Sequence, residues 1–165
     1  MILTILLSFM MMAGLFLMLL SGIGFIQDKR FFSSAPKEVR DAVRPREERF
    51  PGAHAIGWIM AAGSLLMMGS AIVFGAAAGV REGYSFIQFF TRFLIMLLLL
   101  KAFDVIFFDW VLLCNAGFNF FPHFYPETKA VLGRYLFGYN RKTHLAHIAA
   151  FPFAAALLAW ICTML

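Results

Sequence analysis

Four long apolar stretches take up most of this 165-residue chain and restrict what it can fold into. They cover residues 1–27, 54–80, 85–118 and 144–165. Each is long enough for a helix to cross a hydrocarbon layer about 30 Å thick, which takes about 20 residues. Hydrophobic residues make up 62% of the chain and charged residues only 14%, a composition too apolar for a soluble domain. The sequence therefore predicts an all-α integral membrane protein, a single domain in which four transmembrane helices form a bundle.

Positive charge is concentrated in two of the three connections between these stretches. Eleven of the 14 Lys and Arg residues lie within residues 28–53 or 129–142, whereas the third connection contains only Arg81. Cytoplasmic loops of membrane proteins are enriched in Lys and Arg. We therefore expect both basic loops in the cytoplasm, both termini outside, and a multi-pass location in the cell membrane. The net charge of +5 follows this topology, so we expect no nucleic-acid partner.

The second apolar stretch is rich in small residues. Ala71, Gly75 and Gly79 recur every four residues, which places them on one helical face where another helix can approach closely. This face has two interpretations. It contacts another helix of the same bundle, or it contacts a second copy of the chain in a homo-oligomer.

The third stretch carries charged residues at a depth where water is absent. Lys101, Asp104 and Asp109 lie within nine residues of one another. A charge there costs about 2.5 to 3.5 kcal/mol unless it has a partner or a wet cavity. On an α-helix Lys101 can face either aspartate, while the two aspartates point about 140° apart. Nearer the outer surface, Arg92 is expected to extend its charge outward to the interface.

All four histidines fall at the predicted cytoplasmic end. His54 opens the second helix, and His123 lies in the loop after the third helix. His144 and His147 open the fourth helix, and their spacing puts both imidazoles on one helical face, where they can exchange a proton or bind a metal. Two histidines alone do not define a metal site, and the sequence identifies no cofactor.

The connection between the third and fourth helices is more elaborate than a simple turn. Pro122 and Pro126 interrupt any helix there. Polar residues stand among many aromatic ones, which are Phe118, Phe120, Phe121, Phe124, Tyr125, Tyr135, Phe137 and Tyr139. Some of these aromatic rings fit the belt that membrane proteins place at the interface. The others are expected to form a folded lid over the cytoplasmic end of the helices.

Together these residues predict a polar site at the cytoplasmic interface. Asp109 and one of His144 or His147 are expected to act as catalytic residues that share a proton, because they lie at similar depth. A Lys101–Asp104 ion pair would support the site, or would be purely structural. The expected substrate contacts are His54, His123, Asn140, Arg141, Lys101 and Asp104. Acid–base chemistry and metal-assisted chemistry both remain open.

Three classes of function fit this pattern. The first is an enzyme or binder whose partner is a membrane lipid or another lipid-like, apolar small molecule. The second is a proton- or ion-coupled transport component with Lys101, Asp104 and Asp109 as a relay. The third is an accessory subunit of a membrane complex, and a haem-binding bundle with His54 and His144 or His147 as axial ligands is a further alternative. Because polar residues are concentrated at one membrane end, the first class is favoured.

The segment REERFPGAH, residues 46–54, joins the first basic loop to the second helix. It resembles the corresponding segment of the four-helix glutathione-using membrane enzymes of eicosanoid metabolism, in which a basic cytoplasmic loop leads into a helix with catalytic and cofactor contacts. The resemblance is confined to this segment, because no Asn or Glu follows His54 in the second apolar stretch. It therefore implies neither glutathione nor any site residue for this chain.

Overall fold

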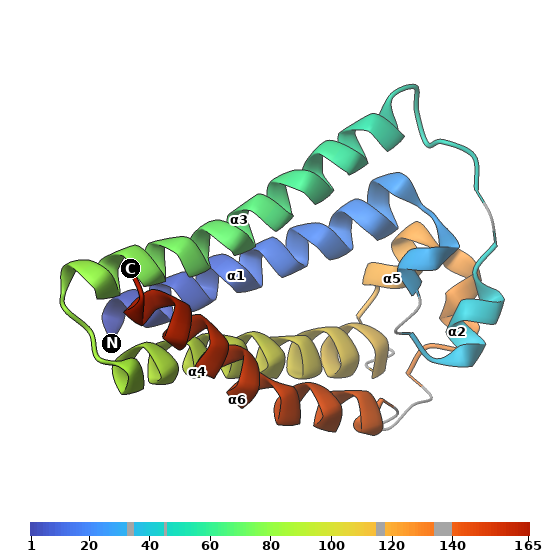
Figure 1. The fold of residues 1–165 in the computed structure, drawn as a ribbon. Helices are drawn as coiled ribbons and strands as arrows, with labels where there is room; N and C mark the ends of the chain where they lie inside the picture. Colours follow the sequence, from blue (N-terminus) through green and yellow to red (C-terminus); the bar gives the residue numbers. More distant parts are fainter. Residues whose placement is uncertain (33–34, 45, 115–117, 134–139) are drawn as a thin grey trace.

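Every regular element of the described chain is a helix, as the sequence predicts (Figure 1). The computed structural model describes residues 1–32, 35–44, 46–114, 118–133 and 140–165. The α-helices are α1 (Ile2–Leu20), α2 (Lys37–Ala42), α3 (Ala53–Arg81), α4 (Phe86–Phe103), α5 (Phe120–Phe124) and α6 (Arg141–Thr163). Two π-helices extend α1 and α4 directly, namely η1 (Ser21–Ile26) and η3 (Asp104–Cys114). Two short 3₁₀ helices are η2 (Lys29–Phe32) and η4 (Pro126–Ala130).

Within the described residues, three helical stretches are long and apolar enough to cross a membrane. They are Ile2–Ile26, Ala53–Arg81 and Arg141–Thr163, which match the first, second and fourth predicted spans. The third predicted span forms α4 and η3, but it is not among the helices that are long and apolar enough to cross a membrane. The reason is its charge, since this helical stretch contains Arg92, Lys101, Asp104 and Asp109. The prediction of four comparable apolar spans is therefore corrected to three, together with one long helical stretch that carries charges.

The long helices run side by side with alternating direction (Figure 1). Both termini lie at the same end as the turn between α3 and α4, which we call the terminal end. The short helices α2 and α5 lie at the opposite end, which we call the loop end. In the bundle α1 packs against α3 and α4, and α4 packs against α6.

The small-residue face of α3 packs inside this bundle. Ala71, Gly75 and Gly79 are all buried. A Cβ atom at Gly79 would lie 2.3 Å from a ring carbon of Phe89 on α4, and one at Gly75 would lie 3.3 Å from Leu7 on α1. The structure therefore supports the first interpretation of this face, contact between helices of one chain. A homo-oligomer stays a prediction, and it would need another surface.

Arg92 does not extend outward as expected. The residue is only 4% exposed. Its Nη1 donates to the backbone carbonyl of Gly75 at 2.6 Å, and its Nη2 donates to the hydroxyl of Tyr84 at 2.6 Å. The arginine stem passes 3.6 Å from the place that a Cβ of Gly75 would take, which is ordinary packing distance.

Apolar side chains fill the middle of the bundle and its half nearer the terminal end. They come from all four long helices and are Leu7, Met11, Ala71, Phe89, Phe93, Met96, Ala155, Ala159 and Cys162. The hydroxyl of Ser8, which is buried in the first helix, donates to the carbonyl of Thr4 in the same helix at 2.8 Å. We call this apolar interior the dry core, and its members Phe93 and Met96 lie between Arg92 and Lys101 along α4.

The loop end is held together by contacts between the first basic loop and the segment around η4. Glu127 accepts hydrogen bonds from the backbone nitrogen of Arg44 at 3.2 Å and from the guanidinium of Arg46 at 2.7 Å. Burial of the Glu127 carboxyl opposes its ionisation, but these hydrogen bonds hold its pKa below the usual value. Beside it, burial raises the pKa of Tyr125 to about 12, so this phenol stays neutral. These contacts connect two loops that border the site described next.

Candidate functional site

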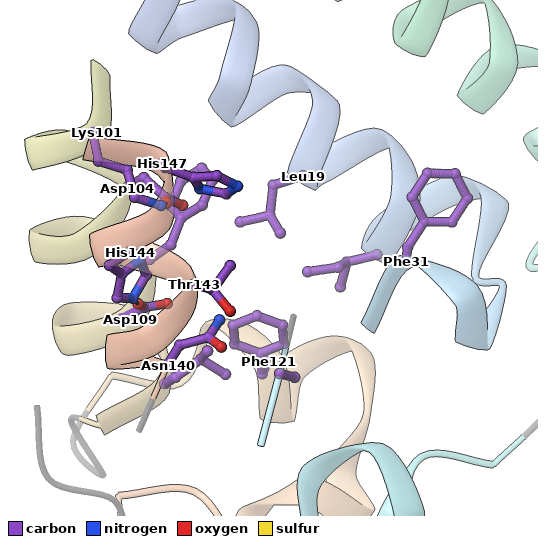
Figure 2. A pocket seen from close by; sticks show the side chains of 14 residues that line it. Leu19, Phe31, Lys101, Asp104, Asp109, Phe121, Asn140, Thr143, His144 and His147 are labelled. Atoms are coloured by element: carbon purple, nitrogen blue, oxygen red, sulfur yellow. Dashed lines mark hydrogen bonds and ion pairs between the residues drawn. The ribbon is translucent and has the colours of Figure 1, made fainter. Parts of the chain in front are cut away.

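A cavity of about 120 Å³ lies at the loop end, between the end of the first helix and the start of the last (Figure 2). One wall is polar and comes from α4, η3 and α6. Its main residues are Lys101, Asp104, Asp109, Asn140, His144 and His147. The facing wall is apolar, with Leu19, Ile23, Phe31 and Phe121, and η3 adds Phe108 and Leu113 to the lining. Six of the nine predicted site residues thus line a single cavity.

The π-helix η3 explains why both aspartates reach this cavity. In a π-helix, hydrogen bonds join residues five apart, whereas an α-helix joins residues four apart. Asp104 and Asp109 are five residues apart, so the π-helix brings them to one side, and both line the cavity. The prediction that they point about 140° apart assumed an α-helix and is wrong. Segments of π-helix inside longer helices occur frequently at functional sites.

Asp109 forms its contact with His144 and not with His147. Oδ2 of Asp109 lies 2.6 Å from Nε2 of His144, and the two side chains are only 10% and 13% exposed. The sequence predicted a pair between Asp109 and one of these histidines, and the structure selects the first. A neutral His144 then carries its proton on Nε2 and donates it to the carboxylate, which leaves Nδ1 as the basic nitrogen. Nδ1 is buried and has no hydrogen-bond partner within the described parts of the chain.

Lys101 and Asp104 form the second pair. Nζ of Lys101 donates to Oδ2 of Asp104 at 2.6 Å, as the sequence predicted. The lysine side chain is 9% exposed and the aspartate side chain 28% exposed. The polar wall therefore contains two carboxylates, each faced by a basic group. The charges of Lys101 and Asp104 compensate one another, whereas the net charge of the Asp109–His144 pair depends on whether His144 carries a second proton.

The remaining polar residues of the cavity come from the start of α6. His147 lines the cavity while remaining exposed, and its ring stacks on Phe151 with centroids 6.5 Å apart. Thr143 also lines the cavity, and sequence reasoning missed it. Its position four residues before His147 was the available signal, because residues four apart share a helical face. The apolar residues Leu19 and Phe31 gave no comparable signal, since they are far from the polar wall in sequence.

Three predicted substrate contacts are not brought to this cavity. His54, His123 and Arg141 are exposed and do not line it. The backbone nitrogen of His54 donates to Glu48 at 2.8 Å, and the ring of His123 packs edge-on against Phe124. A haem held between His54 and a histidine of α6 therefore has no support in this geometry.

Part of the expected lid falls where the structure gives no description. Tyr135, Phe137 and Tyr139 lie outside the described residues. Of the aromatic residues that are described, Phe121 on α5 lines the cavity. Over the same described residues, no group of three or more His, Cys, Asp or Glu side chains is placed to hold a metal ion.

Comparison with protein-family models, with curated proteins and with solved structures finds no match to this chain. Its function is therefore inferred from the site itself.

Proposed function

We propose that this chain is a multi-pass protein of the cell membrane that binds the polar end of a lipid-like molecule at the loop end of its bundle. In this proposal α1 with η1, α3, α4 with η3, and α6 all cross the membrane. The basic loops place the loop end in the cytoplasm. Asp109 and His144 exchange a proton with the bound molecule.

The observation that carries the proposal is the division of the cavity into a polar and an apolar wall. A ligand that meets both walls must have a polar end and an apolar body. The cavity of about 120 Å³ is small compared with the roughly 300 to 1,000 Å³ of sites that enclose a whole small molecule. It therefore suits a polar end group, while the apolar body of the ligand stays between helices or in the lipid.

The two pairs on the polar wall suit an uncharged polar group, such as a hydroxyl or a carbonyl. Lys101 already has Asp104 as its counter-ion, so an anionic group would find no free cation on this wall. Asp109 orients His144 through Nε2, and a carboxylate and an imidazole in contact can take up or release one proton together. In the enzyme form of the proposal, this pair is the acid–base group and Lys101 supplies a positive charge beside the reacting atom.

The dry core of the bundle favours binding over transport. A relay through Lys101, Asp104 and Asp109 would have to continue toward the terminal end. Along α4 this route passes the buried apolar side chains of Phe93 and Met96. Between Lys101 and Arg92 the described core therefore offers apolar packing and not a continuous polar path.

The test is the molecule that co-purifies with the protein in mild detergent, identified by mass spectrometry of an organic extract. We expect His147→Ala to lower ligand occupancy about tenfold while leaving the melting temperature unchanged, because its exposed side chain lines the cavity without a hydrogen bond to the core. Asp109→Asn should also lose the ligand, because it removes the charge that orients His144. The matched control is His54→Ala, an exposed histidine at the same end but outside the cavity.

Two results would contradict the proposal. If Asp109→Asn and His147→Ala retain the ligand and lose only thermal stability, these residues are structural. If the protein in liposomes instead carries a proton flux that Asp104→Asn abolishes, measured with an internal pH-sensitive dye, transport replaces binding as the function.

A further inference from the structure

A second cavity lies at the opposite, terminal end of the bundle. Its volume is about 260 Å³, and it lies between the start of α1 and the start of α4. The residues that matter here are Thr4, Tyr84, Gln88, Thr91, Arg92 and Ile95. It shares no lining residue with the Asp109–His144 cavity, so it is a separate site, and the inference below rests only on the proposed membrane topology.

Arg92 is the central feature of this cavity, because it is a buried cation with neutral partners only. It is 4% exposed, and its guanidinium lies 4.3 Å from the centre of the Tyr84 ring. The two hydrogen bonds described above go to a backbone carbonyl and to the Tyr84 hydroxyl. Within the described residues no carboxylate pairs with Arg92. Its Nε is also buried and has no hydrogen-bond partner there.

Among the described residues, the positive charge of Arg92 has no counter-ion and some of its N–H donors have no acceptor. A guanidinium has five N–H donors, and the two bonds to Gly75 and Tyr84 occupy two of them. A buried charge without a counter-ion is strongly unfavourable. An oxyanion in the adjacent cavity would supply the counter-charge and accept the remaining donors, and arginine is particularly suited to this role.

The other polar groups of the cavity are compatible with an anion. Gln88 accepts hydrogen bonds through Oε1 from the backbone and the hydroxyl of Ser85, which directs its amide oxygen to the cap of α4. Its amide nitrogen keeps its two donors for another acceptor. Thr91 adds an exposed hydroxyl one turn further along. The first turns of a helix also favour negative charge through the helix dipole.

The apolar rim of the cavity decides between a free anion and a lipid. Ile87 and Ile95 line the same cavity, and Ile87 is 61% exposed. In a membrane-spanning bundle this exposed side contacts acyl chains. An anion attached to an acyl chain would satisfy both Arg92 and this rim, whereas free phosphate would leave the rim uncovered.

We infer that the cavity around Arg92 binds the oxyanion head group of an anionic membrane lipid. Arg92 provides the counter-charge, Gln88 and Thr91 provide neutral donors, and the acyl chains lie along Ile87 and Ile95. The site holds the ends of α1 and α4 together through the lipid.

Native mass spectrometry of the detergent-solubilised protein tests this inference, with phosphatidylglycerol, phosphatidylcholine and inorganic phosphate as separate probes. We expect phosphatidylglycerol to bind the unmodified chain about tenfold more tightly than phosphatidylcholine, and Arg92→Gln to remove this preference. Because Arg92→Gln can also disturb the core, a second variant is needed. Thr91→Phe fills the cavity from its exposed side, keeps the buried cation and should abolish the preference as well.

Two controls match these variants. Arg81→Gln removes an exposed positive charge near the same end, and Ala77→Phe adds the same ring at an exposed position of α3 outside the cavity. Both should keep the preference for phosphatidylglycerol. Equal binding of the two lipids by the unmodified chain would overturn the inference, whether or not inorganic phosphate binds. Retention of the preference in Thr91→Phe would overturn it too.

Discussion

At the scale of single residues, the charged side chains away from the exposed ends of the long helices each contact a specific partner. Lys101 meets Asp104, and Asp109 meets His144. Both pairs contain one nearly buried member, so the partner is needed to offset the cost of removing a charge from water. Arg92 differs, because the acceptors of its hydrogen bonds are a carbonyl and a phenol rather than a carboxylate. The cost of burying a charge therefore explains the two side-chain pairs at the loop end. It is also the basis of the lipid site that we propose around Arg92 at the terminal end.

Replacing Lys101 tests whether its pair is structural. We expect Lys101→Met to lower the free energy of unfolding by about 2 kcal/mol, less than for a fully buried pair because Asp104 keeps partial access to solvent. The measurement is thermal unfolding in detergent. The double variant Lys101→Met/Asp104→Leu should recover most of the loss, since it leaves no unpaired carboxylate. A Lys101→Met protein as stable as the unmodified chain would show that Asp104 does not need this partner.

At the scale of elements, the π-helix η3 and the small-residue face of α3 decide how the helices present their side chains. The change from α-helix to π-helix at Asp104 brings residues five apart onto one side, so the two aspartates share a cavity. Along α3, Gly75 and Gly79 allow side chains of α1 and α4 to approach the helix backbone. Close approach of this kind is a main source of helix association in lipid.

Two glycines of α3 provide a matched test of this packing. Gly79→Ala would place a methyl group 2.3 Å from the buried ring of Phe89, so we expect a loss of about 1 to 3 kcal/mol in the free energy of unfolding. At Gly69 a Cβ would meet no atom within 4 Å, so Gly69→Ala should be neutral or raise stability by up to about 1 kcal/mol. Unfolding of both variants in the same detergent gives the comparison. Equal effects at the two positions would mean that α3 and α4 are not packed as described.

At the scale of the whole molecule, the distribution of charge matches the two ends of the bundle. Ten of the eleven basic residues of the two connections lie in their described parts, which are at the loop end with the short helices, and the turn with Arg81 is at the terminal end with both termini (Figure 1). In the proposed topology these basic segments lie on one side of the membrane. The positive-inside rule makes that side the cytoplasm, which is the orientation that we propose for the Asp109–His144 cavity.

Cysteine accessibility in intact cells tests this orientation. In a background without Cys114 and Cys162, single cysteines are introduced by Lys37→Cys, Lys142→Cys and Glu82→Cys, all at exposed positions. We expect an impermeant maleimide to label the Glu82→Cys protein in intact cells, and the other two only after lysis. Labelling of all three in intact cells would rule out the proposed topology, and the reverse pattern would invert it.

The helical class, the three apolar spans and the i,i+3 pair of Lys101 and Asp104 could be predicted from the sequence by itself. These features depend on composition, on the length of apolar runs and on spacing along one helix, and all of these are local properties of the chain. The gathering of Asp and His side chains at one end could be predicted for the same reason, because position along a long helix determines the end at which a residue lies.

Only the tertiary structure decided which of these residues form the site. Asp109 contacts His144 and not His147, and His54 and His123 do not line the cavity. A π-helix, which no pattern in the sequence indicates, turns both aspartates to one side. The tertiary structure also supplied the apolar wall from the end of the first helix and the enclosure of Arg92 by Gly75 and Tyr84. Hydropathy and periodicity establish that a helix exists and how deep each residue lies. The face that each helix turns to its neighbours is set by side-chain packing between segments that are distant in sequence.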